Sequence, residues 1–284
     1  MIFRTLKFLL FCSTFWLMSA CRDETPEINN LNGDRIAVIG HRGCGPRTAA
    51  NPLPENSMAS VQKALELYAA SGVEVDVQMS RDGVLFLYHD DYLETQTNLS
   101  GCIYQYTAEE LRACKYKNSD SYLLSLEELF QYCSSLDFIP FIMLDNKLDL
   151  PCNISSSDEY LLYINLYVNS MHSLIERFHL FEFVYLESNF ELYLDLMSAL
   201  DDQVQLMING SVFDWFSIAN NRNYTGIMTG NNSCTKESVS AAHASGLKVS
   251  IFGVVNTSDA ESAIEKSPDF ILTDDVPMVN QLLK

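Results

Sequence analysis

The sequence predicts an α/β fold, a TIM-type (β/α)8 barrel, and three observations support this prediction. From residue 36 onward, short β-branched or aromatic runs alternate with longer segments of helical periodicity. The runs number eight, which is the number of strands that close such a barrel. The 284-residue chain is 48% hydrophobic, enough for one large core. We therefore expect a single barrel domain over residues 35–284.

The expected strands and helices follow from the local pattern. Regular alternation of strand and helix favours parallel strands joined by helical crossovers. One helix is expected over 58–70, where apolar residues recur near helical spacing, and a longer one over 158–178. The eight expected strands are 36–39, 73–77, 138–144, 183–186, 204–208, 225–228, 248–252 and 270–272.

One apolar run, 84–88, does not fit a parallel crossover. It follows the strand 73–77 after only six residues, whereas a parallel return needs a dozen or more. The intervening Asp82-Gly83 is a strong hairpin-turn signal. We therefore expect a small antiparallel hairpin inserted above the C-terminal face of the barrel. Pairing about this turn would place Glu74 opposite His89 or its neighbour.

The N-terminus has the features of an export signal. Basic residues precede a short apolar run, 8–18, which is too short to cross a membrane comfortably. Small residues before Cys21 resemble a bacterial lipoprotein cleavage site. We expect residues 1–20 to be the signal peptide, Cys21 to be lipidated, and 21–34 to form a tether. The protein would then be an extracytoplasmic, membrane-anchored lipoprotein, on the periplasmic side or the cell surface. An ordinary cleaved secretion signal is the alternative.

The net charge limits the kinds of ligand that the protein is expected to bind, and the cysteine content bears on its cellular compartment. The net charge of −19 disfavours nucleic acid and requires a locally positive site for any anionic ligand. Setting aside Cys12 and the lipidated Cys21 leaves an even number of cysteines, which permits disulfides in an oxidising compartment. Pairs Cys102–Cys114 or Cys133–Cys152 would close short loops, and buried free thiols are the alternative. The six cysteines are Cys44, Cys102, Cys114, Cys133, Cys152 and Cys234.

Two histidines and a pair of carboxylates carry the chemistry. His41 and His89 each end an apolar run, and Glu74 and Asp76 lie between them on one strand. Imidazoles exchange protons near neutral pH. Alternate residues of a strand point to one face, so the two carboxylates can hold a hard cation together. These are the parts of a metal-assisted hydrolase.

The order of these and later motifs resembles the glycerophosphodiester phosphodiesterase family of the phospholipase C-like phosphodiesterase barrel superfamily, here in a bacterial lipoprotein context. Three substitutions depart from the family pattern: Leu124 for proline, Asp145 for glutamate and Phe252 for tryptophan. The matching segments, in order, are His41-Arg42-Gly43, Pro54-Glu55-Asn56-Ser57, Glu74-x-Asp76, Asp82-Gly83, His89-Asp90, Leu124–Leu129, Phe141–Lys147, Glu187–Phe190, Phe252–Asn256 and Thr273-Asp274.

The resemblance implies a site at the C-terminal ends of the strands. A divalent cation would be held by Glu74, Asp76 and Asp145, and three carboxylates without a cysteine favour Ca²⁺ or Mg²⁺ over zinc. His41 and His89 would be the general acid and base, in an order that the sequence leaves open.

Neighbouring residues have implied supporting roles. Arg42 and Lys147 match phosphate-contacting positions. Glu55 would orient Arg42 or the metal shell, and Asp90 would orient His89. Asn56 is expected to cap the helix that begins at residue 58.

The expected activity is metal-dependent hydrolysis of a small glycerophosphodiester to sn-glycerol 3-phosphate and an alcohol. A phospholipase C- or D-like enzyme of the same superfamily is one alternative, and it would need an apolar rim to admit lipid. A non-catalytic phosphodiester-binding lipoprotein is a second alternative. The candidate rim residues are Tyr104, Tyr106, Phe213, Trp215 and Phe216.

Overall fold

A closed parallel barrel forms the centre of the molecule, as predicted. The computed structural model describes residues 27–148, 152, 154–210 and 212–284. Within them, eight parallel strands follow the order β1-β2-β5-β6-β7-β8-β9-β10, and β1 pairs with both β2 and β10. The strands are Ala37–Gly40 (β1), Gly72–Met79 (β2), Phe141–Asn146 (β5), Val184–Ser188 (β6), Gln205–Asn209 (β7), Gly226–Gly230 (β8), Lys248–Val254 (β9) and Phe270–Thr273 (β10).

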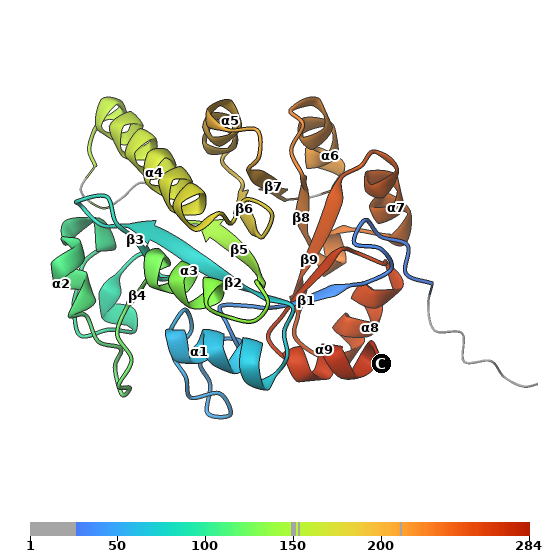
Figure 1. Ribbon diagram of the computed structural model, residues 1–284, viewed down its shortest axis with the longest axis horizontal. Coiled ribbons are helices and arrows are strands. Elements are labelled where there is room, and N and C mark those ends of the chain that lie inside the picture. The colour runs from blue at the N-terminus through green and yellow to red at the C-terminus, as the bar shows by residue number, and fades with distance from the viewer. Residues whose placement is uncertain (1–26, 149–151, 153, 211) are drawn as a thin grey trace, which may run out of the picture.

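Helices surround the strands (Figure 1). The expected helix 58–70 is split, because α1 continues as a π-helical segment, η1. The helix expected over 158–178 is α4 and begins one residue earlier. The helices around the barrel are Met58–Gln62 (α1), Lys63–Leu67 (η1), Leu126–Ser134 (α3), Ser157–Phe178 (α4), Glu191–Leu200 (α5), Val212–Asn221 (α6), Asn231–Ser233 (η4), Lys236–Ala244 (α7), Thr257–Glu265 (α8) and Val276–Leu282 (α9).

Each barrel strand extends one or two residues beyond its expected end. The apolar runs stop where polar residues begin, but the ladder hydrogen bonds continue through those residues. Asn146 on β5 and Ser188 on β6 are examples. Strand β5 also begins three residues later than expected. The polar ends of the strands therefore belong to the rigid sheet, and side chains there are held by it.

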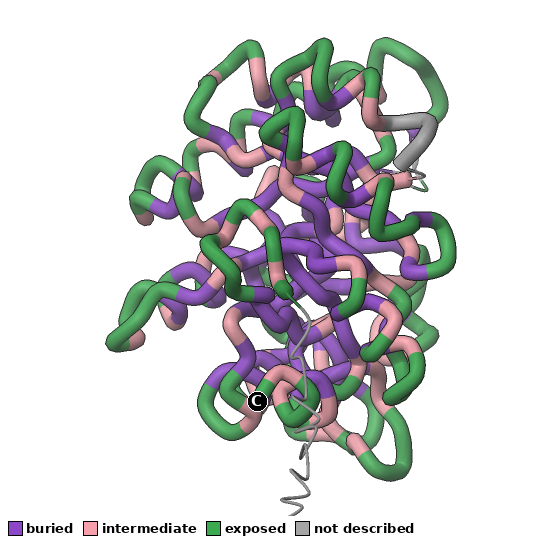
Figure 2. The backbone as a smooth tube through the Cα atoms, turned by 90° about the vertical axis from the view of Figure 1, so that its right-hand side faces the viewer, coloured by how far each residue is buried: buried purple, intermediate pink, exposed green. Residues whose placement is uncertain are grey.

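The barrel interior is filled by side chains, so a site can only lie at an end of the barrel. Phe141, Tyr185 and Phe270 pack edge to face inside it, with ring centroids 5.0–6.0 Å apart. A second apolar layer lies between strands and helices, as expected for parallel strands covered on both faces. Figure 2 shows buried segments, in purple, at the centre and exposed segments, in green, at the periphery.

The predicted antiparallel hairpin is confirmed. Strand β2 extends beyond the barrel and pairs with β3 (Leu85–Leu87), which in turn pairs with β4 (Leu124–Ser125). Val77 lies opposite Leu87, one residue away from the expected register, and Tyr88 N donates to the Asp76 carbonyl. His89 therefore follows directly after the residue paired with Asp76.

The inserted segment between β2 and α3 has a small core of its own. This core includes Phe86, Tyr88, Leu111 and Tyr116, all nearly inaccessible to solvent. The short helices of the insertion are Leu93–Thr95 (η2), Ile103–Gln105 (η3) and Ala108–Arg112 (α2). The insertion is thus a packed unit that can hold His89 in place.

The disulfide joins Cys102 to Cys152, with Cα atoms 6.1 Å apart. Both short-loop pairings expected from the sequence are wrong. Cys114 is buried in the core of the insertion, and Cys133 is buried in the core around the barrel. Because each thiol is buried in a separate core, Cys114 does not reach Cys102 and Cys133 does not reach Cys152. The Cys102–Cys152 disulfide instead joins the insertion to the segment that precedes α4.

The expected signal peptide, residues 1–20, and the expected lipidation site Cys21 lie outside the described residues. The last part of the expected tether contacts the barrel: Leu31 N and the Asn32 side chain donate to Asp269, and Asn30 donates to the Pro268 carbonyl. Among the described residues, no helix is both long enough and apolar enough to span a bilayer.

Candidate active site

His41 and Asp274 meet because β1 and β10 are neighbours in the closed barrel. Each residue directly follows its strand, and His41 Nδ1 lies 2.6 Å from Asp274 Oδ1. His41 Nε2 lies 3.9 Å from Glu74 Oε2. Burial alone would lower the pKa of His41, but the hydrogen bond to Asp274 and the charge of Glu74 raise it above 6.5. From the sequence, Asp274 was part of a matching motif and had no expected role.

Arg42 is held in a tight loop after β1. Its φ is 50°, and the following Gly43 has φ 90°. A Cβ on Gly43 would lie 2.5 Å from Ser60 Oγ, so only glycine fits. Arg42 N donates to Glu74 Oε2 at 2.9 Å, and its guanidinium donates to Glu55 at 2.8 Å. Glu55 therefore contacts Arg42, as the resemblance implied.

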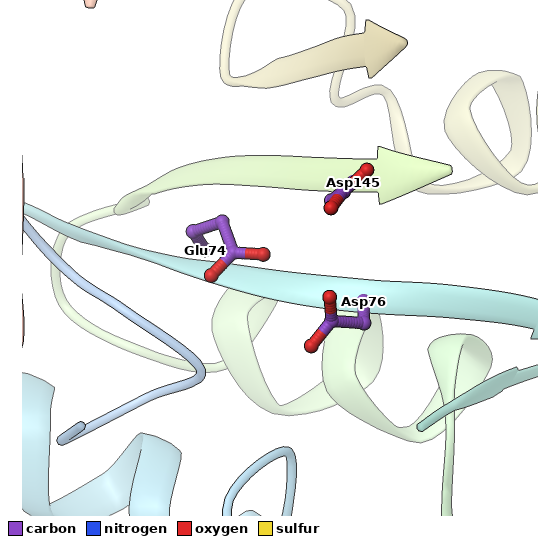
Figure 3. A group of neighbouring side chains, drawn as sticks. All are labelled: Glu74, Asp76 and Asp145. Atoms are coloured by element: carbon purple, nitrogen blue, oxygen red, sulfur yellow. The ribbon is translucent and has the colours of Figure 1, made fainter. Parts of the chain in front are cut away.

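Glu74, Asp76 and Asp145 converge on one side of the sheet. Figure 3 shows Glu74 and Asp76 along β2 and Asp145 on the adjacent β5. Asp76 is paired in register with Asp145, and the three carboxylates offer ligand atoms that all lie within 4.8 Å of one another. Burial and the neighbouring Asp76 charge raise the pKa of Glu74 to about 8. The structure thus brings together the three residues that were predicted as metal ligands.

Asp76 is the most strongly compensated of the three carboxylates. Lys147 Nζ lies 3.1 Å from Asp76 Oδ1 and 2.5 Å from Asp145 Oδ2. Asn56 Nδ2 donates to Asp76 Oδ2 at 2.8 Å. Burial would raise the pKa of Asp76, but the Lys147 and Arg42 cations keep it below its ordinary value. The charge of Asp76 is thus stabilised without any bound ion.

The expected cap role of Asn56 is wrong. Ser57 caps α1, accepting from Ser60 N, while Asn56 has φ 59° and is fully buried against Asp76. Asn56 Oδ1 also accepts from Asp76 N at 3.1 Å. Both residue types are good caps, so the sequence could not distinguish them. In the fold, the Asn56 side chain is instead engaged in two hydrogen bonds with Asp76 of β2.

His89 is oriented by its neighbours in the insertion. Its Nδ1 lies 2.8 Å from Asp90 Oδ1, and Gln78 donates to the carbonyls of Tyr88 and Asp90 on either side. Gln96, which the sequence analysis missed, donates to both Asp90 and Glu55. Gln96 thus links the support of His89 to the support of Arg42.

Glu187 is a fourth carboxylate at the site. It lies on β6 in register with Asp145 and is 2% exposed. Burial, with the charges of Asp145 and Glu74, raises the pKa of Glu187 well above its ordinary value. From the sequence, Glu187 was part of a matching motif and had no expected role. Its position directly after the apolar run 183–186 was the signal that could have identified it.

The donor set fits a divalent cation. The site has four carboxyl groups, from Glu74, Asp76, Asp145 and Glu187, and two cationic side chains, Arg42 and Lys147. Burial and repulsion between neighbouring carboxylates raise the pKa values of Glu74 and Glu187, so a cation that bound there would replace their protons. Oxygen-only ligands suit Mg²⁺ or Ca²⁺. A cavity of about 230 Å³ opens onto these groups. Its lining includes His41, Glu74, Asp145, Glu187, Asn209, Phe252 and Asp274.

Comparison with known proteins agrees with this geometry. A glycerophosphodiester phosphodiesterase of Caldanaerobacter subterraneus is 32% identical over 111 residues, which are 37% of this chain and 43% of the relative. One of Bacillus altitudinis is 39% identical over 75 residues, 26% of this chain and 28% of the relative. The chain spans less than half the length of these curated relatives.

Solved structures show the same fold. A putative glycerophosphoryl diester phosphodiesterase from Silicibacter pomeroyi superimposes with TM-score 0.75 at 19% identity, covering 87% of this chain and 92% of that one. An Oleispira antarctica phosphodiesterase in complex with the product sn-glycerol-3-phosphate gives TM-score 0.70 at 20% identity, covering 87% and 96%. Residues 41–278 match the model of the glycerophosphoryl diester phosphodiesterase family. The chain belongs to the glycerophosphoryl diester phosphodiesterase family.

Proposed function

We propose that the protein hydrolyses small glycerophosphodiesters to sn-glycerol 3-phosphate and an alcohol in a reaction that needs a divalent cation. The observation that carries this proposal is the pair of carboxylate-oriented imidazoles, His41 with Asp274 and His89 with Asp90, beside the acidic cluster. Family membership and the relatives' activities support the same reaction.

Each carboxylate fixes the function of its histidine. A carboxylate at Nδ1 favours the tautomer with the proton on that nitrogen, which leaves Nε2 to accept or donate a proton at the substrate. One imidazole removes a proton from the nucleophile, which is either water or a hydroxyl of the substrate, and the other protonates the leaving alkoxide oxygen. If the substrate hydroxyl attacks first, water then opens the cyclic phosphodiester to complete the hydrolysis. Such proton transfers contribute about 10²–10⁴-fold each.

Arg42 and Lys147 supply the positive charge that an acidic protein needs to bind an anion. The Arg42 side chain is 18% exposed and that of Lys147 is 25% exposed, so both can reach a phosphate while remaining paired with carboxylates. A cation bound by Glu74, Asp76 and Asp145 would offset negative charge developing on the phosphate oxygens. Arg42 also positions Glu74 through its backbone N–H.

The described aromatic residues do not favour a lipid-admitting rim. Tyr104 packs edge to face on Tyr163 with centroids 5.0 Å apart. Tyr106 donates its hydroxyl proton to the Ser100 carbonyl, and Phe216 packs against the core. These three side chains are therefore engaged within the fold, whereas the side chains of Phe213 and Trp215 lie outside the described part of the structure. We propose the small, soluble diester as substrate.

A product-resolved assay tests the proposal. Metal-depleted protein is incubated with glycerophosphocholine, phosphatidylinositol or lysophospholipid, each with Mg²⁺, Ca²⁺ or chelator. We expect glycerol 3-phosphate and choline from the first substrate only, and none with chelator. Diacylglycerol release would instead identify a phospholipase, and binding without turnover would identify the non-catalytic alternative.

We also propose that the protein is an extracytoplasmic lipoprotein anchored through Cys21. The small residues before Cys21 and the Cys102–Cys152 disulfide, which suits an oxidising compartment, support this. Labelling of growing cells with a fatty-acid analogue should mark the wild-type protein in the membrane fraction and leave a Cys21→Ala variant unlabelled. Labelling of both proteins or of neither would contradict the anchor.

A further inference from the structure

Glu187 is a buried carboxyl group that the protein leaves without a partner in the described part of the chain. Both of its oxygens are inaccessible, and neither has a hydrogen-bond partner among the described residues. A buried carboxylate without partners is strongly unfavourable, which is why such groups are normally paired or bound to metal. The charges acting on it come mainly from Asp145 and Glu74, and the Lys147 cation offsets them only in part. A further cation is the partner that would satisfy it.

The position of Glu187 fits such a partner. It lines the same cavity as Glu74 and Asp145, and the amide residue Asn209 of the next strand lines that cavity too. Strand pairing fixes this placement, since Glu187 is in register with Asp145, which is in register with Asp76. One carboxylate from each of three adjacent strands thus stands at the same level of the barrel.

Each of the other three carboxylates already has at least one oxygen in a hydrogen bond or an ion pair. Asp76 accepts from Lys147 on Oδ1 and from Asn56 on Oδ2. The ion pair of Asp145 falls on Oδ2, and the contacts of Glu74 fall on Oε2. Ca²⁺ takes six to eight oxygen ligands and Mg²⁺ takes six, so a shell that begins with partly engaged carboxylates gains most from a fully unengaged one.

We propose that Glu187 is a direct ligand of the divalent cation, completing its shell from β6 alongside Glu74 and Asp145. This inference rests on the proposed cation site. An aspartate at 145 reaches one methylene less far than a glutamate would, and Glu187 on the adjacent strand supplies a longer carboxylate from the same side. The additional negative charge strengthens cation binding, because ligand charge sets affinity at such sites.

Cation binding to metal-depleted protein tests the inference without reliance on turnover. Isothermal titration with Mg²⁺ and Ca²⁺ and thermal melts with and without cation are compared for wild type, Glu187→Gln and Glu187→Asp. Glu176→Gln on the exposed face of α4 is the control for an equal change in net charge. We expect at least about tenfold weaker binding in Glu187→Gln, partial recovery in Glu187→Asp, and wild-type binding in the control.

The melts separate a ligand from a structural residue. Without cation, Glu187→Gln should melt at the wild-type temperature or higher, because it removes a buried uncompensated carboxyl group. With cation, it should gain less stability than wild type. If Glu187→Gln binds the cation with wild-type affinity, or melts at a lower temperature than wild type without cation, Glu187 is not a ligand. Either result would leave the proposed cation site itself intact. Absence of cation binding by wild type would overturn the cation site itself.

Discussion

Asp274 determines the protonation behaviour of His41. Its carboxylate accepts from Nδ1 at 2.6 Å and raises the pKa of an imidazole that burial would otherwise lower. A group whose pKa is raised on folding stabilises the fold fully below its unfolded value, here 6.5, and this contribution is lost as the pH rises through the folded value. The pair thus links acid–base chemistry at the site to stability.

Replacement of Asp274 by asparagine should lower the pKa of His41. Burial lowers this pKa, and the carboxylate that counteracts the effect of burial is then absent. An NMR titration of the imidazole should show the shift. The limb of the pH–rate profile that reports His41 should move to lower pH. The variant should lose stability mainly below pH 6.5, and the difference from wild type should shrink at higher pH.

The matched control is Asp201→Asn, which breaks a similar pair, His172 with Asp201 at 2.9 Å, away from the cavity. Its pH–rate profile should equal that of wild type. An unshifted His41 titration in Asp274→Asn would show that the carboxylate does not tune the imidazole.

The individual residues show where sequence reasoning succeeds and where it stops. His41, Glu74 and Asp76 could be named as candidates because each ends or interrupts an apolar run. The roles of Asn56 and Glu187 depend on which strand lies beside which and at what level, and spacing along one chain does not contain that information. Asp274 became assignable only with barrel closure, which places the last strand against the first.

At the level of elements, the β1–α1 loop places Arg42 by means of Gly43. Gly43→Ala should destabilise the protein by about 1–3 kcal/mol from the positive φ alone, with a further cost from the contact with Ser60. Activity should fall as well, because Arg42 N would move away from Glu74. Urea unfolding and the diesterase assay measure the two effects.

Gly246→Ala provides the comparison. Gly246 also has positive φ, 78°, but a Cβ there would meet nothing within 4 Å. The Gly246→Ala variant should therefore lose only the stability that the positive φ costs, and it should retain full activity. Equal losses in the two variants would mean that the fit against Ser60 is unimportant.

The disulfide is the element-level constraint on the insertion that carries His89. It closes a 50-residue separation, and removing it should cost about 2–4 kcal/mol. A Cys102→Ser/Cys152→Ser variant should therefore melt at a lower temperature than wild type. Reductant should lower the melting temperature of wild type and leave the variant unchanged. Equal melting of the two oxidised proteins would contradict the constraint.

At the level of the whole molecule, the alternation of strand and helix sufficed to predict the barrel, since eight parallel strands joined by helical crossovers have few other arrangements. Strand ends were predicted too early because the apolar pattern stops where the site begins. The disulfide was mispredicted because closing a short loop is easy only if both thiols face each other. Cys114 and Cys133 instead face separate cores.

The central claim is that barrel closure and the inserted hairpin bring two histidines to one cation-dependent reaction. The most direct test is kcat/KM for glycerophosphocholine at saturating cation for His41→Ala, His89→Ala and the double variant, with cation affinity measured on the same proteins. We predict that each single variant loses about 10²–10⁴-fold or more, that the double variant loses much less than the product of the two, and that cation binding persists. Retention of the wild-type rate by either single variant would contradict the account.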